Sequence, residues 1–522
     1  MTASGKRKER NEMPVVFSSR ASITLVIPPS PFLLDERVFV SLGILRIASV
    51  LERHGYEVHL LDLSGVSNFE VALESYLNKT NDEIFGITAT TPQLPSAFKI
   101  AHTIRLMRPT ARLILGGPHV TLTLAAMRLE NKLGRTQFGR ASKAGQKLID
   151  MFDVLVAGDG ELAVLRAVEP DSPKILDGDD NRGDLFLTDK TYETMPAPAR
   201  HLVDLHSYKY AVEGFPATSL IAQLGCPFNC GFCGGRNSKS LRVVRTRSEK
   251  SIVDEVEFLH REYGYTGFMF YDDELNVSKS MVQLMNKLAD LQDRLGVEFR
   301  LRGFVKAELF TDEQAQAMYR AGFRWLLCGF EAADPRILTN IQKRATLDDN
   351  TRAVEIAKRR NLKVKALMSI GHPGENEQSA LAIQKWLVEV GVDEFDCTII
   401  TTYPGTPYYD FAVPEGRENV WVYTQPQTGD RLYAYDVDFT VTADYYKGDP
   451  DGGYRSFVFT DFLSSEQLVQ VRDRIERETR RVLNIPFNPA RASMRFEHSM
   501  GQGLPDFILR SSHPQNALAM NG

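Results

Sequence analysis

The chain has 522 residues, a length that suits two or three domains, and its 43% apolar and 25% charged residues are typical of globular proteins. With 62 Lys plus Arg against 67 Asp plus Glu the net charge is −5, so nothing suggests a nucleic-acid partner. No apolar run is long enough to span a membrane. The basic start (Lys6, Arg7, Lys8 and Arg10) has no apolar segment behind it and makes a poor export signal, so we expect residues 1–20 to form a disordered leader.

Strand and helix patterns alternate from Ser22 onward. The strand-like runs cover residues 23–27, 58–61, 84–88, 113–115 and 154–156, and apolar residues recur at helical spacing between them. Strands that alternate with helices predict an α/β fold with a doubly wound, Rossmann-like parallel sheet. We assign residues 21–165 to this domain.

Small and polar residues follow three of these strands. They form the turns Thr88-Ala-Thr-Thr91, Gly116-Gly117-Pro118-His119 and Gly158-Asp159-Gly160-Glu161. Ligands of such sheets bind beyond the carboxyl ends of the strands, and paired glycines let the backbone approach a bulky ligand closely. The turns therefore predict a ligand crevice, whose occupant these residues alone do not identify.

Residues 166–214 have the Asp, Gly and Pro content of a linker. Six strand-like runs follow, separated by helical patterns, and they begin near Ser219, Gly267, Val297, Phe323, Lys363 and Glu394. Six repeats are too few for a closed eight-stranded barrel. We assign residues 215–412 to this second unit and expect its active site at the carboxyl ends of the strands.

The first of these strands leads into Cys226-Pro-Phe-Asn-Cys230-Gly-Phe-Cys233. An iron-sulfur cube normally takes four thiolates, so a loop that supplies three leaves one iron free to bind another molecule. A structural zinc site would need a fourth ligand nearby, and a disulfide does not suit a chain with 5 Cys and no export signal. We therefore predict that Cys226, Cys230 and Cys233 hold a cluster, and that Cys328 and Cys397 are core residues.

Charged residues follow the next two strands. Asp272 and Asp273 are costly to bury without a cationic partner, although a solvated loop or a helix N-cap would also explain them. Arg302 suits a charge-assisted bond with a carboxylate, and a surface ion pair is the alternative.

The last three strands end in the turns Gly329-Phe330-Glu331, Gly371-His372-Pro373-Gly374-Glu375 and Tyr403-Pro404-Gly405-Thr406-Pro407. Beyond residue 412, tyrosines crowd one stretch, and Ser464-x-x-Gln467 begins an amphipathic helix with a capping box. We expect residues 413–522 to form a small α/β or helical domain that contributes to substrate specificity.

The cysteine loop and the ordered strand-end turns together resemble the radical S-adenosylmethionine (radical SAM) enzymes. The resemblance implies a partial (β/α)6 barrel, with the methionyl group of S-adenosylmethionine on the open iron. It also implies roles in binding this cofactor. Phe232 would lie near the adenine, Glu331 would contact the ribose hydroxyls, and Gly371 and Pro373 would lie beside the adenosyl group. Asp272 and Asp273 would lie near the methionyl ammonium, and Arg302 would bind a carboxylate of the methionine or of the substrate.

The first domain resembles the cobalamin-binding domain found in front of many radical SAM enzymes, because it shares their Gly-Gly-Pro-His and Gly-acid-Gly-Glu turns. The resemblance implies cobalamin contacts from Thr88, Thr91, Gly116, Gly117, His119, Gly158, Gly160 and Glu161. The sequence has no Asp-x-His-x-x-Gly motif, which supplies a lower cobalt ligand in mutases and methionine synthases. We therefore expect cobalt without a lower histidine and His119 as a turn residue.

These resemblances imply a cobalamin-dependent radical SAM enzyme that methylates an unactivated carbon of a small-molecule substrate, through a 5′-deoxyadenosyl radical and methylcobalamin. The alternatives are a non-methylating cyclisation or rearrangement, and a cobalamin-sensing regulator, for which we find no DNA-binding or signalling module. The implied cofactors are a [4Fe-4S] cluster, S-adenosylmethionine and cobalamin, and the implied electron donor is a flavodoxin or ferredoxin. Few cysteines and an oxygen-sensitive cluster favour the cytoplasm.

Overall fold

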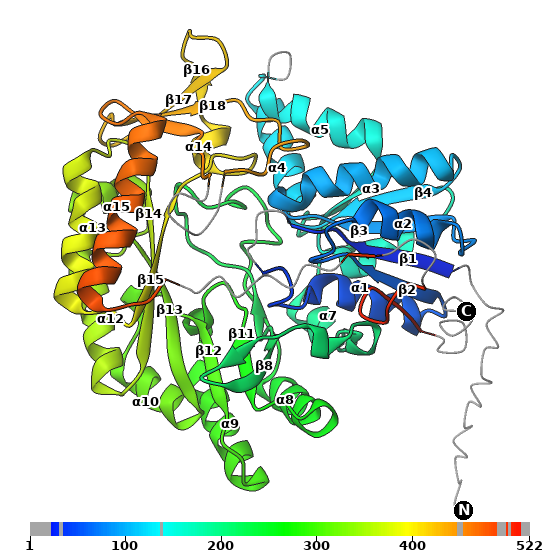
Figure 1. Ribbon diagram of the computed structural model, residues 1–522, viewed down its shortest axis with the longest axis horizontal. Coiled ribbons are helices and arrows are strands. Elements are labelled where there is room, and N and C mark those ends of the chain that lie inside the picture. Colours follow the sequence, from blue (N-terminus) through cyan, green and yellow to red (C-terminus); the bar gives the residue numbers. More distant parts are fainter. Residues whose placement is uncertain are drawn as a thin grey trace, which may run out of the picture.

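The computed structural model describes residues 22–30, 35–135, 139–445, 453–487, 497–498 and 503–512. These residues form two α/β lobes that lie side by side (Figure 1). The leader predicted for residues 1–20 lies outside the described residues. None of the helices in the described ranges has both the length and the apolar character needed to cross a membrane.

The first lobe is built on a sheet of order β20-β2-β1-β3-β4-β5-β6. Its strands are β1 (Ser22–Ile27), β2 (Glu57–Asp62), β3 (Ile84–Thr88), β4 (Arg112–Gly116), β5 (Val154–Gly158), β6 (Ile175–Gly178) and β20 (Leu509–Ser511). Its helices are α1 (Leu42–Arg53), α2 (Phe69–Leu77), α3 (Leu94–Met107), α4 (Pro118–Lys132), α5 (Arg140–Met151) and α6 (Gly160–Ala167). Since β1 lies between β2 and β3, with parallel pairing from β2 to β6, the doubly wound Rossmann-like fold is confirmed.

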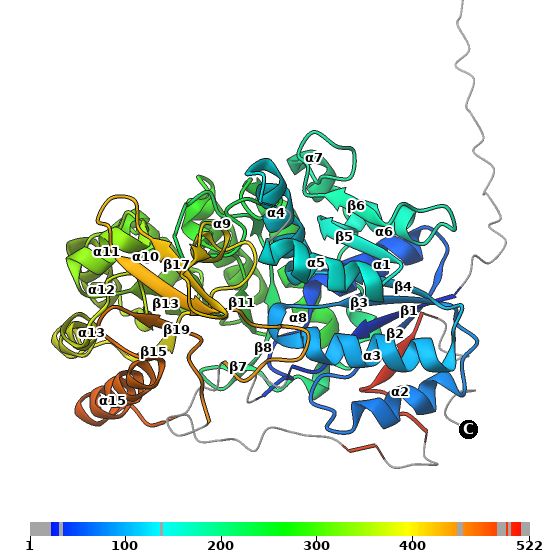
Figure 2. The ribbon, with the colours of Figure 1, turned by 90° about the horizontal axis from the view of Figure 1, so that it is seen from above.

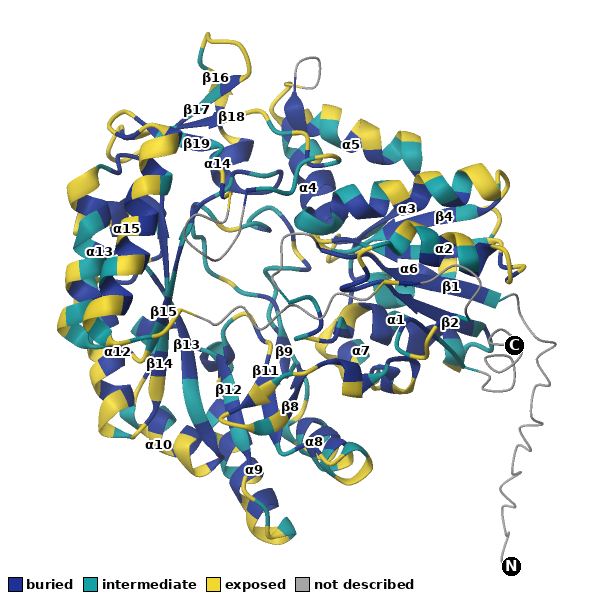
Figure 3. Cartoon of the chain, in the orientation of Figure 1, coloured by how far each residue is buried: buried dark blue, intermediate teal, exposed yellow. Residues whose placement is uncertain are grey.

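Helices cover both faces of this sheet because neighbouring side chains of a strand point to opposite sides. Leu25 belongs to a core cluster that includes residues of α1 and α6, whereas Val26 belongs to a second cluster with residues of α2, α3 and α5. The strands are accordingly buried between helices whose outer faces are exposed (Figure 3).

The strand β20 comes from the far end of the chain. It pairs antiparallel with β2, so that Leu509 lies opposite Leu61 and Ser511 lies opposite His59. Figure 2 shows this red strand beside the blue strands of the first lobe. A segment that we grouped with the C-terminal region therefore completes the edge of the N-terminal sheet.

The second lobe contains a curled sheet of order β15-β14-β13-β12-β11-β8-β7. Its strands are β7 (Ala211–Val212), β8 (Phe215–Leu220), β11 (Gly267–Phe270), β12 (Arg300–Phe304), β13 (Phe323–Glu331), β14 (Lys363–Ile370) and β15 (Glu394–Ile399). All neighbours from β8 to β15 pair in parallel, and the short β7 is antiparallel. The predicted partial (β/α)6 barrel is confirmed.

Helices surround the outer face of the barrel sheet. They are α8 (Glu249–Tyr263), α9 (Met281–Leu295), α10 (Asp312–Arg320), α11 (Pro335–Ile341), α12 (Leu347–Arg359), α13 (Glu377–Val390) and α15 (Ser465–Leu483). Ser464 caps α15 by accepting a hydrogen bond from the Gln467 amide, as its sequence predicts. α15 is bonded to β15, since Arg480 donates to the Phe395 carbonyl at 2.7 Å. The helix that follows the last barrel strand is thus found in the C-terminal region.

Smaller elements connect these layers. α7 (Asp189–Glu193) lies in the predicted linker, and β9 (Gln223–Leu224) pairs with β10 (Arg245–Thr246) around the cysteine loop. After α14 (Pro407–Asp410), a four-stranded antiparallel sheet is formed by β16 (Val413–Pro414), β17 (Val420–Thr424), β18 (Arg431–Tyr435) and β19 (Val458–Thr460). Residues after 412 therefore lie in three places: this sheet, the outer barrel layer and the edge of the first lobe.

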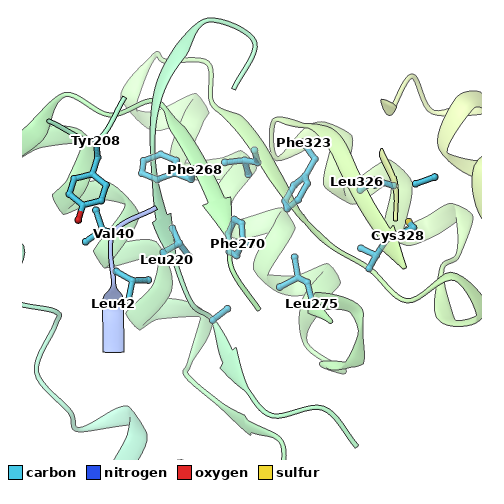
Figure 4. Close-up of a cluster of buried hydrophobic side chains, with 14 of the residues drawn as sticks. Val40, Leu42, Tyr208, Leu220, Phe268, Phe270, Leu275, Phe323, Leu326 and Cys328 are labelled. Atoms are coloured by element: carbon cyan, nitrogen blue, oxygen red, sulfur yellow. The ribbon is translucent and has the colours of Figure 1, made fainter. Parts of the chain in front are cut away.

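One hydrophobic cluster extends through both lobes. Figure 4 shows Val40 and Leu42, from the entrance to α1, beside Leu220 and Phe268 of the barrel strands, and all four are buried in the same cluster. A shared core holds the carboxyl ends of the two sheets in a fixed relation to each other. This relation positions the site described below.

Candidate active site between the two lobes

The three cysteines lie on one loop beyond the carboxyl end of β8, immediately after β9. Cys226 and Cys230 are half-buried and Cys233 is exposed. The loop begins at Gly225, where φ is +85° and a Cβ would lie 2.2 Å from the Val243 carbonyl oxygen, so only glycine fits there. Arg242 donates to the carbonyls of Pro227 and Phe228 at 2.7 and 3.1 Å and so holds the loop from outside.

The three cysteine sulfurs of this loop are arranged to bind a large group through thiolates. Burial raises the pKa of the Cys226 thiol to about 11, and it also raises the pKa of Cys230, against the opposing effect of Lys343 and Lys306. Binding of a cationic group would release these protons. Within the described ranges, no three His, Cys, Asp or Glu side chains converge closely enough for a single ion. A cube of four irons needs sulfurs that are spread around it, which three cysteines along one loop provide.

The acidic run after β11 divides into different roles. Asp272 is buried and accepts hydrogen bonds from the amides of Ala222 and Gln223 at 3.1 and 2.5 Å, so it fixes the chain just before the cysteine loop. Glu274, which the sequence analysis did not select, has a buried Oε2 without a hydrogen-bond partner in the described part of the chain. Burial raises the pKa of Glu274 to about 7, against the effect of Lys343 and Lys306. Glu274 therefore offers a free carboxylate acceptor close to the cysteine loop, and Gln223 Oε1 is a second buried acceptor without a partner among the described residues.

Four of the predicted residues meet at the ends of β13 and β14. The Glu331 carboxylate lies 3.0 Å from the Lys343 ammonium and accepts a hydrogen bond from Ser369 Oγ at 2.8 Å. Ser369 in turn lies 2.9 Å from His372 Nε2, between Gly371 and Pro373, and the His372 ring is 5.5 Å from the Phe232 ring. Burial lowers the pKa of His372 to about 4, so this imidazole is neutral at physiological pH. The structure thus brings Phe232, Glu331, Gly371 and Pro373 together.

A cavity of about 500 Å³ separates the carboxyl ends of the two sheets. The first lobe lines it with the predicted Thr88, Gly116, Gly117, Gly158, Gly160 and Glu161. The second lobe contributes Gly225, Tyr271 and Asp273, so the cavity reaches the residue before Cys226. At Gly117, with φ +99°, a Cβ would lie 2.8 Å from Thr88 Oγ1 and 2.9 Å from the Ala89 backbone, so a side chain would clash with the turn that forms one wall.

Two predicted residues of the first lobe lie behind this wall. His119 is 3% exposed, and its ring nitrogens lie 3.0 Å from Thr91 Oγ1 and 3.3 Å from Thr123 Oγ1. Burial lowers the pKa of His119 to about 4. The imidazole is therefore a neutral group that is bonded within its own lobe, and neither Thr91 nor His119 lines the cavity.

Arg302 is also distant from the cofactor side of the barrel. The strand register places it beside Trp325, and Trp325 beside Lys363, the first residue of β14. Trp325 precedes Glu331 by six residues on β13, which at about 3.3 Å per residue is a separation of roughly 20 Å along the strand. Arg302 therefore lies toward the amino ends of the strands and does not join the groups around the cysteine loop.

The cavity also has walls that the sequence analysis missed. Gly43 and Ile47 of α1 line it, as do Ser240 and Arg245 from the segment after the cysteine loop. Arg245 forms a buried ion pair with Asp159, and burial raises the pKa of Asp159 to about 7 despite that partner. Gly43 lies at the start of a helix pattern that is visible in the sequence, whereas the short β9–β10 pair has no periodic signal of its own.

Comparison with known proteins agrees with this geometry. The family model described as the radical SAM superfamily matches residues 220–387, and the one described as a B12 binding domain matches residues 36–149. An uncharacterized methyltransferase of Pyrococcus horikoshii is 27% identical over 408 residues, which cover 75% of this chain and 83% of the relative. An anaerobic magnesium-protoporphyrin IX monomethyl ester cyclase of Cereibacter sphaeroides is 24% identical over 70% of this chain and 58% of the cyclase.

Among solved structures, the radical SAM methyltransferase TsrM from Kitasatospora setae, with cobalamin and a [4Fe-4S] cluster bound, aligns with a TM-score of 0.60 at 16% identity. The alignment covers 90% of this chain and 92% of TsrM, so the two share their fold over nearly the whole length. The matched domains identify the cofactors as a [4Fe-4S] cluster, S-adenosylmethionine and cobalamin, and the cysteine loop and the glycine-walled cavity fit them. The chain therefore contains a B12-binding domain in front of a radical SAM domain, the arrangement of the cobalamin-dependent radical SAM enzymes.

Proposed function

We propose that this protein transfers a methyl group to an unactivated carbon of a small molecule. One observation carries the proposal: a single cavity is lined by the glycine turns of the first lobe and by Gly225, next to Cys226. A corrinoid in this cavity would therefore lie beside the loop that carries the cysteines. An enzyme that joins a radical centre to a methyl carrier needs such a shared space.

When bound, the cluster and S-adenosylmethionine supply a radical, and cobalamin supplies the methyl group. The chain positions these groups. We assign Cys226, Cys230 and Cys233 to the cluster and the unpaired Oε2 of Glu274 to the methionyl ammonium, because a buried acceptor without a partner favours a cation. We assign Glu331 to the ribose hydroxyls and Phe232 to the adenine, since both lie in one bonded group with His372.

The first lobe would hold cobalamin through its glycine turns. Gly116, Gly117, Gly158 and Gly160 present backbone to the cavity, which suits the large surface of a corrinoid or its nucleotide tail. Thr88 and Glu161 add polar groups to the same wall. We do not assign His119 to cobalt, because both of its ring nitrogens already have hydroxyl partners.

The names of two relatives support methylation. The Pyrococcus horikoshii protein is called a methyltransferase, and TsrM is a radical SAM methyltransferase. The alternative is cyclisation without methyl transfer, which is favoured by the similarity to the magnesium-protoporphyrin monomethyl ester cyclase. A redox partner such as a flavodoxin or ferredoxin would deliver the electron to the cluster, and the reducing cytoplasm would keep its thiolate ligands intact.

The two chemistries leave different products. Methylation consumes one S-adenosylmethionine as methyl source, which leaves S-adenosylhomocysteine, and a second one as radical source, which leaves 5′-deoxyadenosine and methionine. The enzyme is purified without oxygen, supplied with cobalamin and a reductant, and incubated with candidate small molecules. We expect both nucleoside products in equal amounts whenever a substrate is turned over. Turnover with 5′-deoxyadenosine alone would contradict methylation and favour the alternative.

A further inference from the structure

A second cavity lies at the opposite mouth of the barrel from the cofactor site. It has a volume of about 510 Å³ and is lined by Glu213, Arg302, Trp325, Lys363 and Glu394, together with two small residues of β7. Lys363 and Glu394 begin β14 and β15, so the cavity is formed at the amino ends of the strands. The catalytic ends of such strands are the carboxyl ends, and the proposed methylation makes no use of this mouth.

The acids around this cavity are each paired with a cation other than Arg302. Glu213 lies 2.7 Å from the Lys363 ammonium. Glu394 and Asp396 both lie 2.8 Å from the Lys365 ammonium. Arg300 also lies 3.5 Å from Glu213, and Arg480 lies 3.7 Å from Asp396, so each of these carboxylates has a cationic partner other than Arg302.

Two cations line the cavity, and within the described residues Arg302 is the one without a carboxylate partner, since Lys363 pairs with Glu213. The Nε of Arg302 is buried and has no hydrogen-bond partner in the part of the chain that the structure describes. Its guanidinium lies over the Trp325 ring, 5.7 Å from the ring centroid, and the Lys363 ammonium lies 5.3 Å from the same centroid. A charged fork and an aromatic ring thus line the same cavity. The Tyr210 hydroxyl is close by: burial raises the pKa of Tyr210, and the Arg302 guanidinium opposes the rise.

A half-buried arginine loses part of its hydration shell. Folded proteins normally compensate this loss with a carboxylate or another hydrogen-bond acceptor, and Arg302 has no carboxylate partner among the described residues. The planar guanidinium fork matches a carboxylate in a two-point contact, and the ring of Trp325 offers a flat apolar surface beside it. We propose that this cavity binds the carboxylate of a small planar organic acid, with Arg302 on the carboxylate and Trp325 against the ring. The site is separate from the cofactor site and does not depend on the proposed methylation.

The test uses benzoate and benzamide, which share shape and differ in charge. Binding to the cluster-loaded protein is measured by saturation-transfer NMR and calorimetry for the wild type and for Arg302→Gln, Arg302→Lys and Trp325→Leu. The matched control is Arg324→Gln, because Arg324 neighbours Trp325 in sequence and instead contacts the Tyr319 ring and Glu298. Iron content and circular dichroism report whether each variant is folded.

We expect the wild type and Arg324→Gln to bind benzoate and not benzamide. Loss of a charge-assisted contact should weaken benzoate binding by roughly 10- to 100-fold in Arg302→Gln, and Arg302→Lys should retain part of the affinity. Trp325→Leu should also weaken benzoate binding, because the aromatic surface beside Arg302 is lost. Equal affinity of the wild type and folded Arg302→Gln, equal binding of the acid and the amide, or no saturable binding to the wild type would overturn the proposal. None of these results would change the nucleoside products that test methylation.

Discussion

The Lys343 ammonium and the Glu331 carboxylate form a buried ion pair, 3.0 Å apart, with side chains that are 5% and 13% exposed. Burial lowers the pKa of Lys343, but Glu331 and Glu274 outweigh it, so the pKa lies above its usual value and the lysine stays charged. Since Ser369 donates to the second oxygen of Glu331, both carboxylate oxygens are oriented before any ligand arrives. A carboxylate held in this way can accept hydrogen bonds from a diol without reorganisation.

This arrangement predicts the effect of Glu331→Gln. The variant keeps the shape of the side chain and removes its charge, so we expect the dissociation constant for S-adenosylmethionine to rise by about 10-fold. Iron content should not change, because Glu331 is not a cluster ligand in our proposal. Equilibrium dialysis measures the first quantity and metal analysis the second. The control is Glu298→Gln, which removes an exposed carboxylate at the amino end of the barrel; equal affinity of both variants would remove the assigned role of Glu331.

The cysteine loop predicts which thiols hold iron. Replacement of Cys226, Cys230 and Cys233 by Ala should reduce iron from about four per chain to near zero and abolish cleavage of S-adenosylmethionine. Cys328→Ala is the matched control, because Cys328 is 2% exposed in the core on β13 and should leave the iron content unchanged. Iron and sulfide analysis after anaerobic reconstitution distinguishes these cases, and iron retained by the triple variant would end the cluster assignment.

Gly43 offers a way to fill the cavity without disturbing its walls. It lines the cavity from the first turn of α1, and a Cβ at this position would meet no atom within 4 Å. Gly43→Trp should therefore fold normally, occupy the cavity and lower cobalamin retention by at least about 10-fold, the effect of losing roughly 1.4 kcal/mol of binding free energy. Absorption spectra of the purified protein report bound cobalamin.

Gly43→Ala is the control for that variant. A single methyl group in open space should leave cobalamin bound, and the helix should gain at most about 1 kcal/mol because alanine has less backbone freedom to lose than glycine. If Gly43→Trp retained cobalamin as well as Gly43→Ala does, the cofactor would have to bind elsewhere.

A buried polar group in the first lobe predicts a pH dependence of stability. His59 Nδ1 lies 2.7 Å from Asp82, which also accepts a hydrogen bond from the Tyr76 hydroxyl. Burial raises the pKa of Asp82, but the hydrogen bonds from His59 and the serine and threonine of β1 outweigh it, so the pKa is lowered. Burial lowers the pKa of His59, but Asp82 outweighs it and the pKa is raised.

The two pKa shifts have opposite effects on how stability depends on pH. The lowered pKa of Asp82 contributes stability above its unfolded value of about 3.9, and that contribution is lost as the pH falls below it. The raised pKa of His59 contributes stability below about 6.5, and that contribution is lost as the pH rises through the folded value. Denaturant unfolding across pH should therefore show a maximum in mildly acidic solution. Asp82→Asn should lower stability by about 3 kcal/mol and flatten the profile; an unchanged profile would contradict this account.

Much of the fold follows from local patterns, because buried parallel strands and amphipathic helices alternate visibly in the sequence. The turns at Gly116–Gly117 and Gly158–Gly160 could be placed at a ligand cavity because the carboxyl ends of parallel strands meet at one edge of a sheet. Gly225 and the cysteine loop follow the first barrel strand for the same reason. These positions depend on strand order alone.

Positions that depend on register or on distant partners could not be predicted in this way. Arg302 lies on the expected strand, but its height along the barrel follows from its pairing with Trp325, which the sequence does not reveal. The helix at 465–483 could be recognised from its cap and its apolar stripe, yet nothing local indicates that it packs on β15. The Glu274 Oε2 atom has no hydrogen-bond partner among the described residues, and its surroundings include Lys306 and Lys343, which lie far along the chain. Neither fact can be read from the local sequence.

The pairing of β20 with β2 means that the polypeptide passes from one lobe to the other twice, once after β6 and again before Leu509. Together with the hydrophobic cluster that spans both lobes, these two covalent crossings keep the lobes from drifting apart. Breaking the β2–β20 pairing would remove one of the two links between the lobes without altering any residue that lines the cavity.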